Sequence, residues 1–347
     1  MKEKSRQYLG FDIGTSRLVV ARPSLGGAQT ETMLNAFIEV PDMPATVNSL
    51  KKHEVQFLRH NGVLLAYGQH ASVFAELFHA DLRRPMRNGV VNLQEPANQA
   101  VLLQMITSLA GEPAGPATLG YSVPSSGIQR EGVSASQLTH HRSAIDRIFT
   151  ALGYEAHAIV EAEALIYSEL EENGYSGLAI SFGAGLTNVA MTYLSVPVLD
   201  FSISRGGDSI DIATAEVLGE KASRVRLFKE NEFSLLSDNT SDSMTRTVKI
   251  FYSELIEHVV AQLANVLVNS NDVPRLREPI PVVIGGGTSM PPGFVRAFEK
   301  ALREYQWPFP ISHVRHAKDP LNAVARGLLR YVQVNFASAE EASAAAG

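Results

Sequence analysis

The chain has 347 residues, of which 45% are hydrophobic and 19% are charged, a composition typical of globular rather than disordered proteins. Because this length exceeds that of most single cores, we expect two linked lobes. The 30 basic and 36 acidic residues give a net charge of −6, which excludes a broad electrostatic attraction to nucleic acid or anionic lipid. Cysteine is absent, so disulfides and thiolate metal sites are excluded.

The first seven residues are short of apolar side chains and lead directly into a strand-like run. They do not resemble a signal peptide, and no run of about 20 apolar residues occurs that would span a membrane. These features predict an intracellular, water-soluble protein in the cytoplasm, with no direct membrane insertion and no nucleic-acid partner.

Strands and helices are predicted to alternate along the first half of the chain. The expected strands are residues 8–11, 18–21, 63–67, 118–123 and 158–160. The expected helices are residues 71–78, 98–109, 137–152 and 163–171. Gly153 follows the third of these helices and is a typical stop signal for a helix.

The second half repeats the order of the first. The expected strands are residues 177–181, 188–193, 198–203 and 281–284, and the expected helices are residues 210–218, 247–269 and 321–335. A strand, a glycine turn and a returning strand therefore occur twice, about half a chain apart, which two related α/β lobes would produce. The residues beyond 337 are predicted to form a flexible tail.

The first glycine turn joins the strands at 8–11 and 18–21 and has the sequence Asp-Ile-Gly-Thr-Ser, residues 12–16. Gly14 allows the backbone to approach an anion closely, and the Thr15 and Ser16 hydroxyls add hydrogen-bond donors. Asp12 is suited to hold a hydrated Mg²⁺, which prefers carboxylate, water and phosphate oxygens. These are also common residues of an ordinary β-hairpin, and that interpretation remains open.

The second glycine turn has the sequence Ser-Phe-Gly-Ala-Gly-Leu-Thr-Asn, residues 181–188. Gly183 and Gly185 are suited to hold phosphate from the opposite side, although a glycine bulge in a strand has the same pattern. A third turn, Gly285-Gly286-Gly287, follows an apolar strand, where bare backbone accommodates a flat ring or a ribose. A tight strand-to-helix turn is the alternative there. Neither a P-loop motif nor a dinucleotide-binding motif is present.

The order of these segments resembles the actin superfamily of ATPases, and in particular bacterial actins of the MreB and MamK type. The resemblance covers residues 8–333. It rests on the two hairpins, the triple-glycine turn, and three supporting segments at residues 81–90, 205–211 and 319–327. It implies an α/β, two-lobed actin-like ATPase fold in which each lobe is a mixed β-sheet flanked by helices, with a nucleotide cleft between the lobes. The implied lobes are residues 1–175 with 320–337, and residues 176–319, followed by the tail at 338–347.

The resemblance also assigns candidate residues, all of them in the glycine turns or in segments close to them. The implied nucleotide-binding residues are Asp12, Gly14, Thr15, Ser16, Gly183, Ala184, Gly185, Leu186, Thr187, Gly207, Asp208, Arg226, Gly285, Gly286, Gly287 and Thr288. The implied cofactors are ATP and Mg²⁺, with Asp12 close to the metal through water. Arg226 takes the place of a family lysine near the ribose.

Glu161 falls where bacterial actins carry the glutamate that positions the attacking water. An acid that complements a helix dipole is the structural alternative. The segment that begins at Glu161 departs from the family, because it reads Glu-Ala-Glu-Ala rather than Glu-Pro-x-Ala. Ser181 and Asn188 also depart from it, since they stand where the family has aspartates. Two negative charges near Mg²⁺ are lost, so slow or impaired ATP hydrolysis is expected beside retained ATP binding.

The resemblance implies a cytoskeletal protein that binds ATP with Mg²⁺ and self-associates into filaments. An assembly factor or scaffold of the same fold, which binds nucleotide without polymerising, is the first alternative, and Ser181 and Asn188 favour it. A chaperone-type or kinase-type ATPase is the second, although the sequence shows no separate substrate domain. The sequence leaves open whether the chain hydrolyses ATP.

Overall fold

The computed structural model describes residues 6–78, 80–126, 133–237, 241–269 and 276–337. The chain divides into two compact units. Unit 1 comprises residues 1–123, 133–159 and 328–347, and unit 2 comprises residues 124–132 and 160–327. The lobe boundaries expected from the sequence, after residues 175 and 319, stay a prediction. The predicted tail at 338–347 lies outside the described residues.

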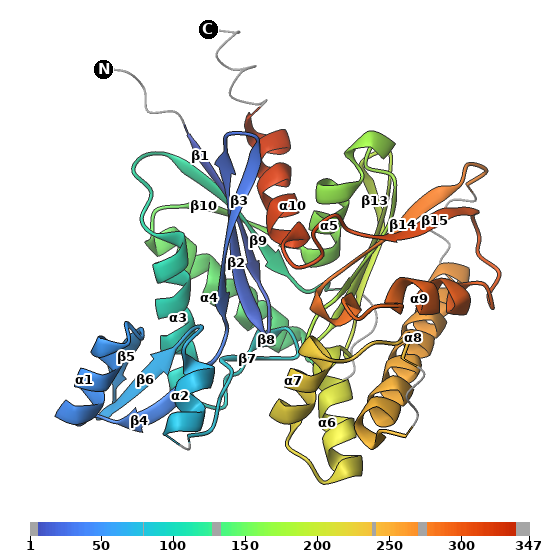
Figure 1. Ribbon diagram of the computed structural model, residues 1–347. Helices are drawn as coiled ribbons and strands as arrows, with labels where there is room; N and C mark the ends of the chain where they lie inside the picture. Colours follow the sequence, from blue (N-terminus) through green and yellow to red (C-terminus); the bar gives the residue numbers. More distant parts are fainter. Residues whose placement is uncertain (1–5, 79, 127–132, 238–240, 270–275, 338–347) are drawn as a thin grey trace, which may run out of the picture. The chain divides into compact units, whose positions relative to one another are not determined.

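Unit 1 contains a five-stranded sheet, two small sheets and the helices around them (Figure 1). Its elements are β1 (Gln7–Ile13), β2 (Arg17–Ser24), β3 (Gly27–Leu34), β4 (Phe37–Pro41), α1 (Pro44–Lys52), β5 (Phe57–His60), β6 (Val63–Tyr67), α2 (Ala71–Leu77), β7 (Met86–Arg87), β8 (Val90–Val91), α3 (Pro96–Ala110), β9 (Ala117–Val123), α4 (Ala135–Ala151) and β10 (Glu155–Val160). Helix α10 (Ala323–Val332) begins in unit 2 and ends in unit 1, and a π-helical turn (Gln333–Ala337) follows it.

Unit 2 contains a second five-stranded sheet with helices on both faces. Its elements are α5 (Glu161–Glu169), a 3₁₀ turn (Glu171–Asn173), β11 (Gly177–Phe182), β12 (Thr187–Tyr193), β13 (Val196–Ile203), α6 (Gly207–Leu218), α7 (Ala222–Asn231), α8 (Ser243–Asn269), β14 (Ile280–Gly285), a 3₁₀ turn (Gly287–Ser289), α9 (Phe294–Leu302) and β15 (Ile311–His316).

The two large sheets have the same strand order. In unit 1 the order is β10-β9-β1-β2-β3, and in unit 2 it is β15-β14-β11-β12-β13. In each sheet the central strand pairs antiparallel with the strand that follows it and parallel with a strand from much later in the chain. The prediction of two related α/β lobes with mixed sheets is therefore confirmed.

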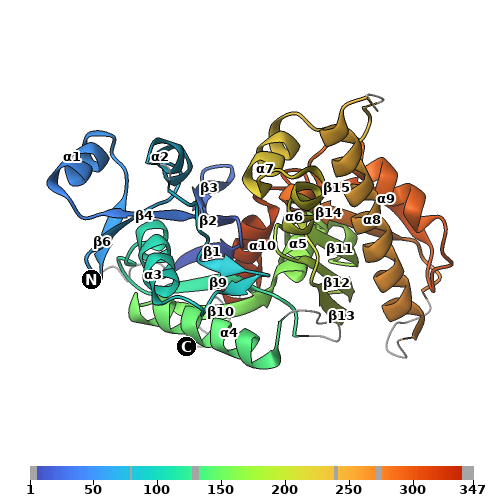
Figure 2. The same cartoon turned by 90° about the horizontal axis from the view of Figure 1, so that it is seen from below.

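The two faces of the unit 2 sheet carry different side chains. Large apolar residues of β11 and β12, among them Ile180, Phe182 and Met191, pack in one core with α8 and α9. On the other face, the small Ala179 and Ala190 pack with α5. Figure 2 shows α5 beside the strands of this sheet. Because side chains alternate along a strand, Ser181 and Asn188 share this second face with the alanines. The sheet thus presents its polar residues toward α5.

Helices α5 and α10 approach each other closely at Gly327. A Cβ atom at this position would collide with the carbonyl oxygen of Ala164 in α5, so only glycine fits. In the described part of the chain, no helix combines the length and apolar character needed to cross a membrane.

Candidate functional site

The first hairpin has a tightly closed turn. The Gly14 amide donates to the Arg17 carbonyl at 3.0 Å, and a Cβ at Gly14 would lie 2.8 Å from that same oxygen. The side chain of Asn35 donates to the Gly14 carbonyl at 2.9 Å, and the Thr15 hydroxyl accepts from the Gly89 amide at 3.0 Å. The turn therefore requires glycine, and neighbouring segments of unit 1 fix its backbone.

Asp12 lies at the end of β1, just before this turn. The hydroxyl of Ser122 donates to Asp12 Oδ1 at 2.8 Å and accepts from the Ile13 amide at 2.7 Å. Burial raises the pKa of the Asp12 carboxyl to about 6, while the Ser122 hydrogen bond acts in the opposite direction. A carboxylate that the fold leaves poorly solvated is suited to a cation partner.

The second hairpin closes in the same way as the first. The Gly183 amide donates to the Leu186 carbonyl at 2.9 Å, and a Cβ at Gly183 would lie 2.9 Å from that oxygen. The carbonyls of Gly183 and Ala184 accept from the first amides of α6, at Gly207 (3.0 Å) and Asp208 (2.8 Å). These bonds join the second hairpin to α6 and satisfy two amides at the start of that helix.

The triple-glycine turn contacts the second hairpin as well. The Thr288 hydroxyl donates to the Gly183 carbonyl at 2.8 Å. Gly286 has φ +86°, and a Cβ there would collide with the Phe182 carbonyl. A Cβ at Gly206 would lie 2.5 Å from the Ala184 carbonyl oxygen. Three segments that the sequence singled out separately thus meet in unit 2.

Glu161 begins α5 and lies over the strands of the second hairpin. Its Oε1 accepts from the Ser181 hydroxyl at 2.6 Å, and its Oε2 accepts from the Asn188 side-chain amide at 2.7 Å. Ser181 and Asn188 therefore both donate to this carboxylate. Glu161 also lies in the first turn of α5, where an acidic side chain complements the helix dipole, so this alternative role fits the structure as well.

Lys229 of α7 is a residue that the sequence reasoning did not select. Its Nζ lies 2.6 Å from Asp211 Oδ1 of α6 and donates to the Gly207 carbonyl at 2.8 Å, with both side chains less than 10% exposed. Burial raises the pKa of the Asp211 carboxyl, and Lys229 partly offsets that effect. Arg226 lies on the same helix, within electrostatic range of Asp211. The spacing of Val225 and Lys229, four residues apart on one buried helix face, was the available signal.

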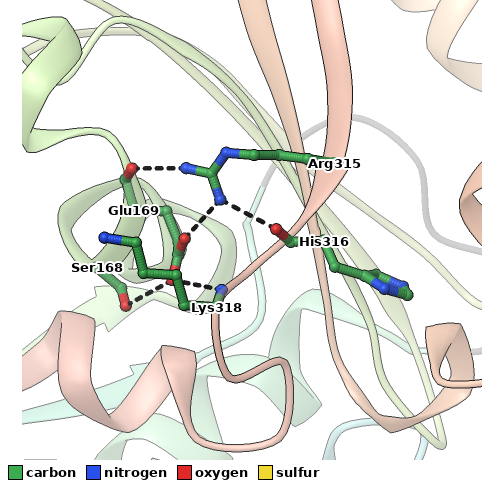
Figure 3. Close-up of polar contacts among 5 residues, drawn as sticks. All are labelled: Ser168, Glu169, Arg315, His316 and Lys318. Carbon is green, nitrogen blue, oxygen red and sulfur yellow. Dashed lines mark hydrogen bonds and ion pairs between the residues drawn. The ribbon is translucent and has the colours of Figure 1, made fainter.

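The other end of α5 is anchored by an arginine. Arg315 donates to the Glu169 carboxylate at 2.6 Å and to the Glu169 carbonyl at 2.8 Å (Figure 3). The second oxygen of the Glu169 carboxylate accepts from the Lys318 amide at 3.1 Å. Helix α5 is therefore held at its last residue as well as at its first.

The predicted site residues form two sets, one in each unit. Asp12, Gly14, Thr15 and Ser16 belong to unit 1, and the residues at 183–187, 207–208 and 285–288 belong to unit 2 together with Glu161. The predicted residues of unit 1 form one continuous turn, and in unit 2 the structure brings together the second hairpin, the start of α6 and the triple-glycine turn. In the described part of the chain, no group of three or more His, Asp or Glu side chains is arranged to bind a metal directly.

The family of this chain follows from a match to a known family model. The family model described as Volactin matches residues 8–331, a span that includes both hairpins and the triple-glycine turn. The chain belongs to the Volactin family. No curated protein matches the sequence of this family member.

Solved structures show the fold of this Volactin family member. MamK in a double helical filament superposes with a TM-score of 0.71 at 17% identity, over 95% of this chain and 99% of that one. MreB5 of Spiroplasma citri bound to ADP gives 0.66 at 16% identity, over 97% and 99%. The ethanolamine utilization protein EutJ from Carboxydothermus hydrogenoformans gives 0.54 at 14% identity, over 95% and 92%. The actin-like fold expected from the sequence is confirmed.

Proposed function

We propose that this protein is an actin-like cytoskeletal protein of the cytoplasm that binds ATP with Mg²⁺ through its two glycine hairpins and polymerises into filaments. The observation that carries the proposal is the repeated hairpin. Gly14 and Gly183 each close the same turn at the end of the central strand of two sheets with one strand order. Such turns let backbone amides approach an anion closely.

The similar structures support the proposal by analogy. One of the MamK structures is a double helical filament, and another is a non-polymerising mutant bound to AMPPNP. Structures of MreB5 of Spiroplasma citri hold ADP or AMPPNP. An actin-like fold with a glycine hairpin in each unit fits the same behaviour.

The residues of this chain fit a magnesium ion held mostly by water and phosphate. Asp12 supplies one poorly solvated carboxylate, and Mg²⁺ commonly binds one or two carboxylates while keeping several waters. When bound, the ion would neutralise charge on the phosphates. The remaining roles fall to the chain: Thr15, Ser16 and the residues at 183–187 bind phosphate, while Gly207, Asp208, Arg226 and the residues at 285–288 hold the nucleoside. Glu161 orients the attacking water.

Sedimentation and negative-stain microscopy test polymerisation in ATP, ADP and no nucleotide. We expect filaments whose amount depends on the nucleotide. Gly14→Ala and Gly183→Ala should each weaken nucleotide binding by about tenfold or more, because each added methyl lies under 3 Å from a backbone oxygen. Gly62→Ala is the control for a strained hairpin backbone outside the predicted site, since Gly62 has φ +82° but no neighbour within 4 Å of an added Cβ. Unchanged affinity in both hairpin variants would contradict the proposal.

A non-polymerising scaffold or assembly factor is the second candidate. The observation that favours it is the pair of uncharged residues, Ser181 and Asn188, that holds Glu161. In that case the nucleotide would be a structural ligand, bound without turnover. Nucleotide binding by monomers that stay monomeric across nucleotides and salt concentrations would select this candidate over the filament.

A further inference from the structure

A row of polar residues crosses the unit 2 sheet beneath the start of α5. Ser202 of β13, Asn188 of β12 and Ser181 of β11 are successive cross-strand partners, and Gly285 of β14 continues the row. Ser181 and Asn188 are 1% exposed and Ser202 is 7% exposed. Their neighbours on this face are alanines packed against α5. Buried polar groups in such a layer must be hydrogen-bonded to one another.

The hydrogen bonds of this row run in one direction. The Ser125 backbone amide, which can only donate, donates to Ser202 Oγ at 3.0 Å. The Ser202 hydroxyl in turn donates to Asn188 Oδ1 at 2.6 Å. The Asn188 amide nitrogen is thereby left to face Glu161, to which it donates at 2.7 Å. The orientation of the Asn188 side chain is therefore determined by its neighbours in the sheet.

Each carboxylate oxygen of Glu161 accepts from one of these side chains, and the two donors come from adjacent strands. Ser181 and Asn188 are direct partners in the antiparallel pair, so the distance between the donors is fixed by the sheet. Hydrogen bonds to a charged acceptor are stronger than those between neutral groups. The carboxylate is thus oriented by strands of the second hairpin as well as by its own helix.

We infer that Ser181 and Asn188 are positioning residues for Glu161, with Ser202 fixing the amide of Asn188. The inference rests on the proposed function, since it assigns these residues to the orientation of the carboxylate that directs water at the nucleotide. The chain thus uses two neutral donors to hold one carboxylate. Such supporting contacts keep a reacting group within the narrow geometry that turnover requires.

Steady-state phosphate release under polymerising conditions tests the inference. Ser181→Ala and Asn188→Ala should each lower kcat by about tenfold or more while leaving KM for ATP unchanged, because orientation of the carboxylate is lost and nucleotide binding is not. Ser202→Ala should have a smaller effect, about two- to fivefold, because Asn188 remains. Ser181→Thr keeps the hydroxyl and should restore most of kcat.

Thr192→Val is the matched control. Thr192 lies on the same strand, is 2% exposed, and donates from its hydroxyl to the Tyr175 carbonyl rather than to Glu161. The substitution removes one buried side-chain hydrogen bond from β12. A loss of kcat that came only from destabilising this strand would therefore appear in Thr192→Val as well. We expect kcat of Thr192→Val to stay within about twofold of wild type.

A thermal double-mutant cycle tests the contact without relying on activity. Glu161→Ala and Asn188→Ala should show losses in Tm that are not additive, since each removes the same bond. Additive losses would overturn the inference. So would unchanged kcat in both Ser181→Ala and Asn188→Ala, or a wild type that binds ATP without turnover. Absence of nucleotide binding in wild type would instead reject the proposed function, and the cycle would still decide whether the contact exists.

Discussion

His141 is a buried imidazole on α4, on the same face as Ile145 and Phe149. Neither ring nitrogen has a hydrogen-bond partner among the described residues. Burial, with a smaller effect from His140, lowers the pKa of the His141 imidazole from 6.5 to about 4. The ring is therefore neutral in the folded protein wherever the pH lies above that value.

The lowered pKa predicts a loss of stability in acid. The His141 imidazole is protonated below pH 6.5 in the unfolded chain, whereas its lowered pKa keeps it neutral in the folded state down to about pH 4. This one group should reduce the free energy of unfolding by about 2 kcal/mol between pH 7 and pH 5. Urea unfolding at the two pH values measures it. His141→Leu should remove this part of the slope, whereas His313→Leu, at an exposed position, should keep it.

Residue identity predicted some of the site and missed the rest. The glycines of the turns were found because backbone close to an anion requires them, and the structure confirms their steric need at Gly14 and Gly183. Lys229 was missed because its partner, Asp211, is 18 positions away on another helix. Pairing of this kind is decided by how α6 and α7 pack, which no local pattern encodes.

At the scale of elements, α5 is held against the rest of unit 2 through polar contacts at both of its ends. The carboxylate of Glu169 is 3% exposed and the Arg315 side chain is 31% exposed. Removing one partner of a buried ion pair leaves the other charge without compensation, which is strongly destabilising. Because Arg315 is partly exposed, part of that effect is screened by solvent.

Arg315→Met should therefore lower the free energy of unfolding by about 2 kcal/mol, less than the loss expected for a fully buried pair. Chemical denaturation of the full chain measures the change. Arg303→Met is the matched control, since Arg303 pairs with Glu299 at 2.8 Å but is 76% exposed. It should change stability by no more than about 0.5 kcal/mol. Equal losses in the free energy of unfolding would show that the Arg315–Glu169 pair stabilises the protein no more than an exposed ion pair does.

The long helices and the buried central strands were predicted, among them α3, α4, α8, β1 and β11. The missed strands include exposed edge strands and very short strands, as well as the buried β4. Strand β3 alternates exposed polar residues at the edge of its sheet, and β15 carries His and Arg side chains at the edge of the other. Edge strands lack the continuous apolar run that marks a central strand, so their sequences resemble loops.

At the scale of the whole molecule, the chain is built from two units that share one sheet topology and hold separate cores. Each unit contributes one glycine hairpin at the end of its central strand. The repeated topology was visible in the sequence because both turns contain glycines. The surrounding strands need only apolar residues of suitable size, so their sequences can differ between the two units while the fold stays the same.

If one nucleotide engages both hairpins, it should stabilise both units together. A ligand that binds only the native state adds about 2.7 kcal/mol at 100 times its Kd. AMPPNP with Mg²⁺ should therefore raise the unfolding temperature of every transition that the nucleotide-free protein shows. Calorimetry measures this shift. Gly14→Ala, which alters only the unit 1 hairpin, should remove most of this shift from unit 2 as well. A variant in which unit 2 retains its full shift would show that the second hairpin binds nucleotide without the first.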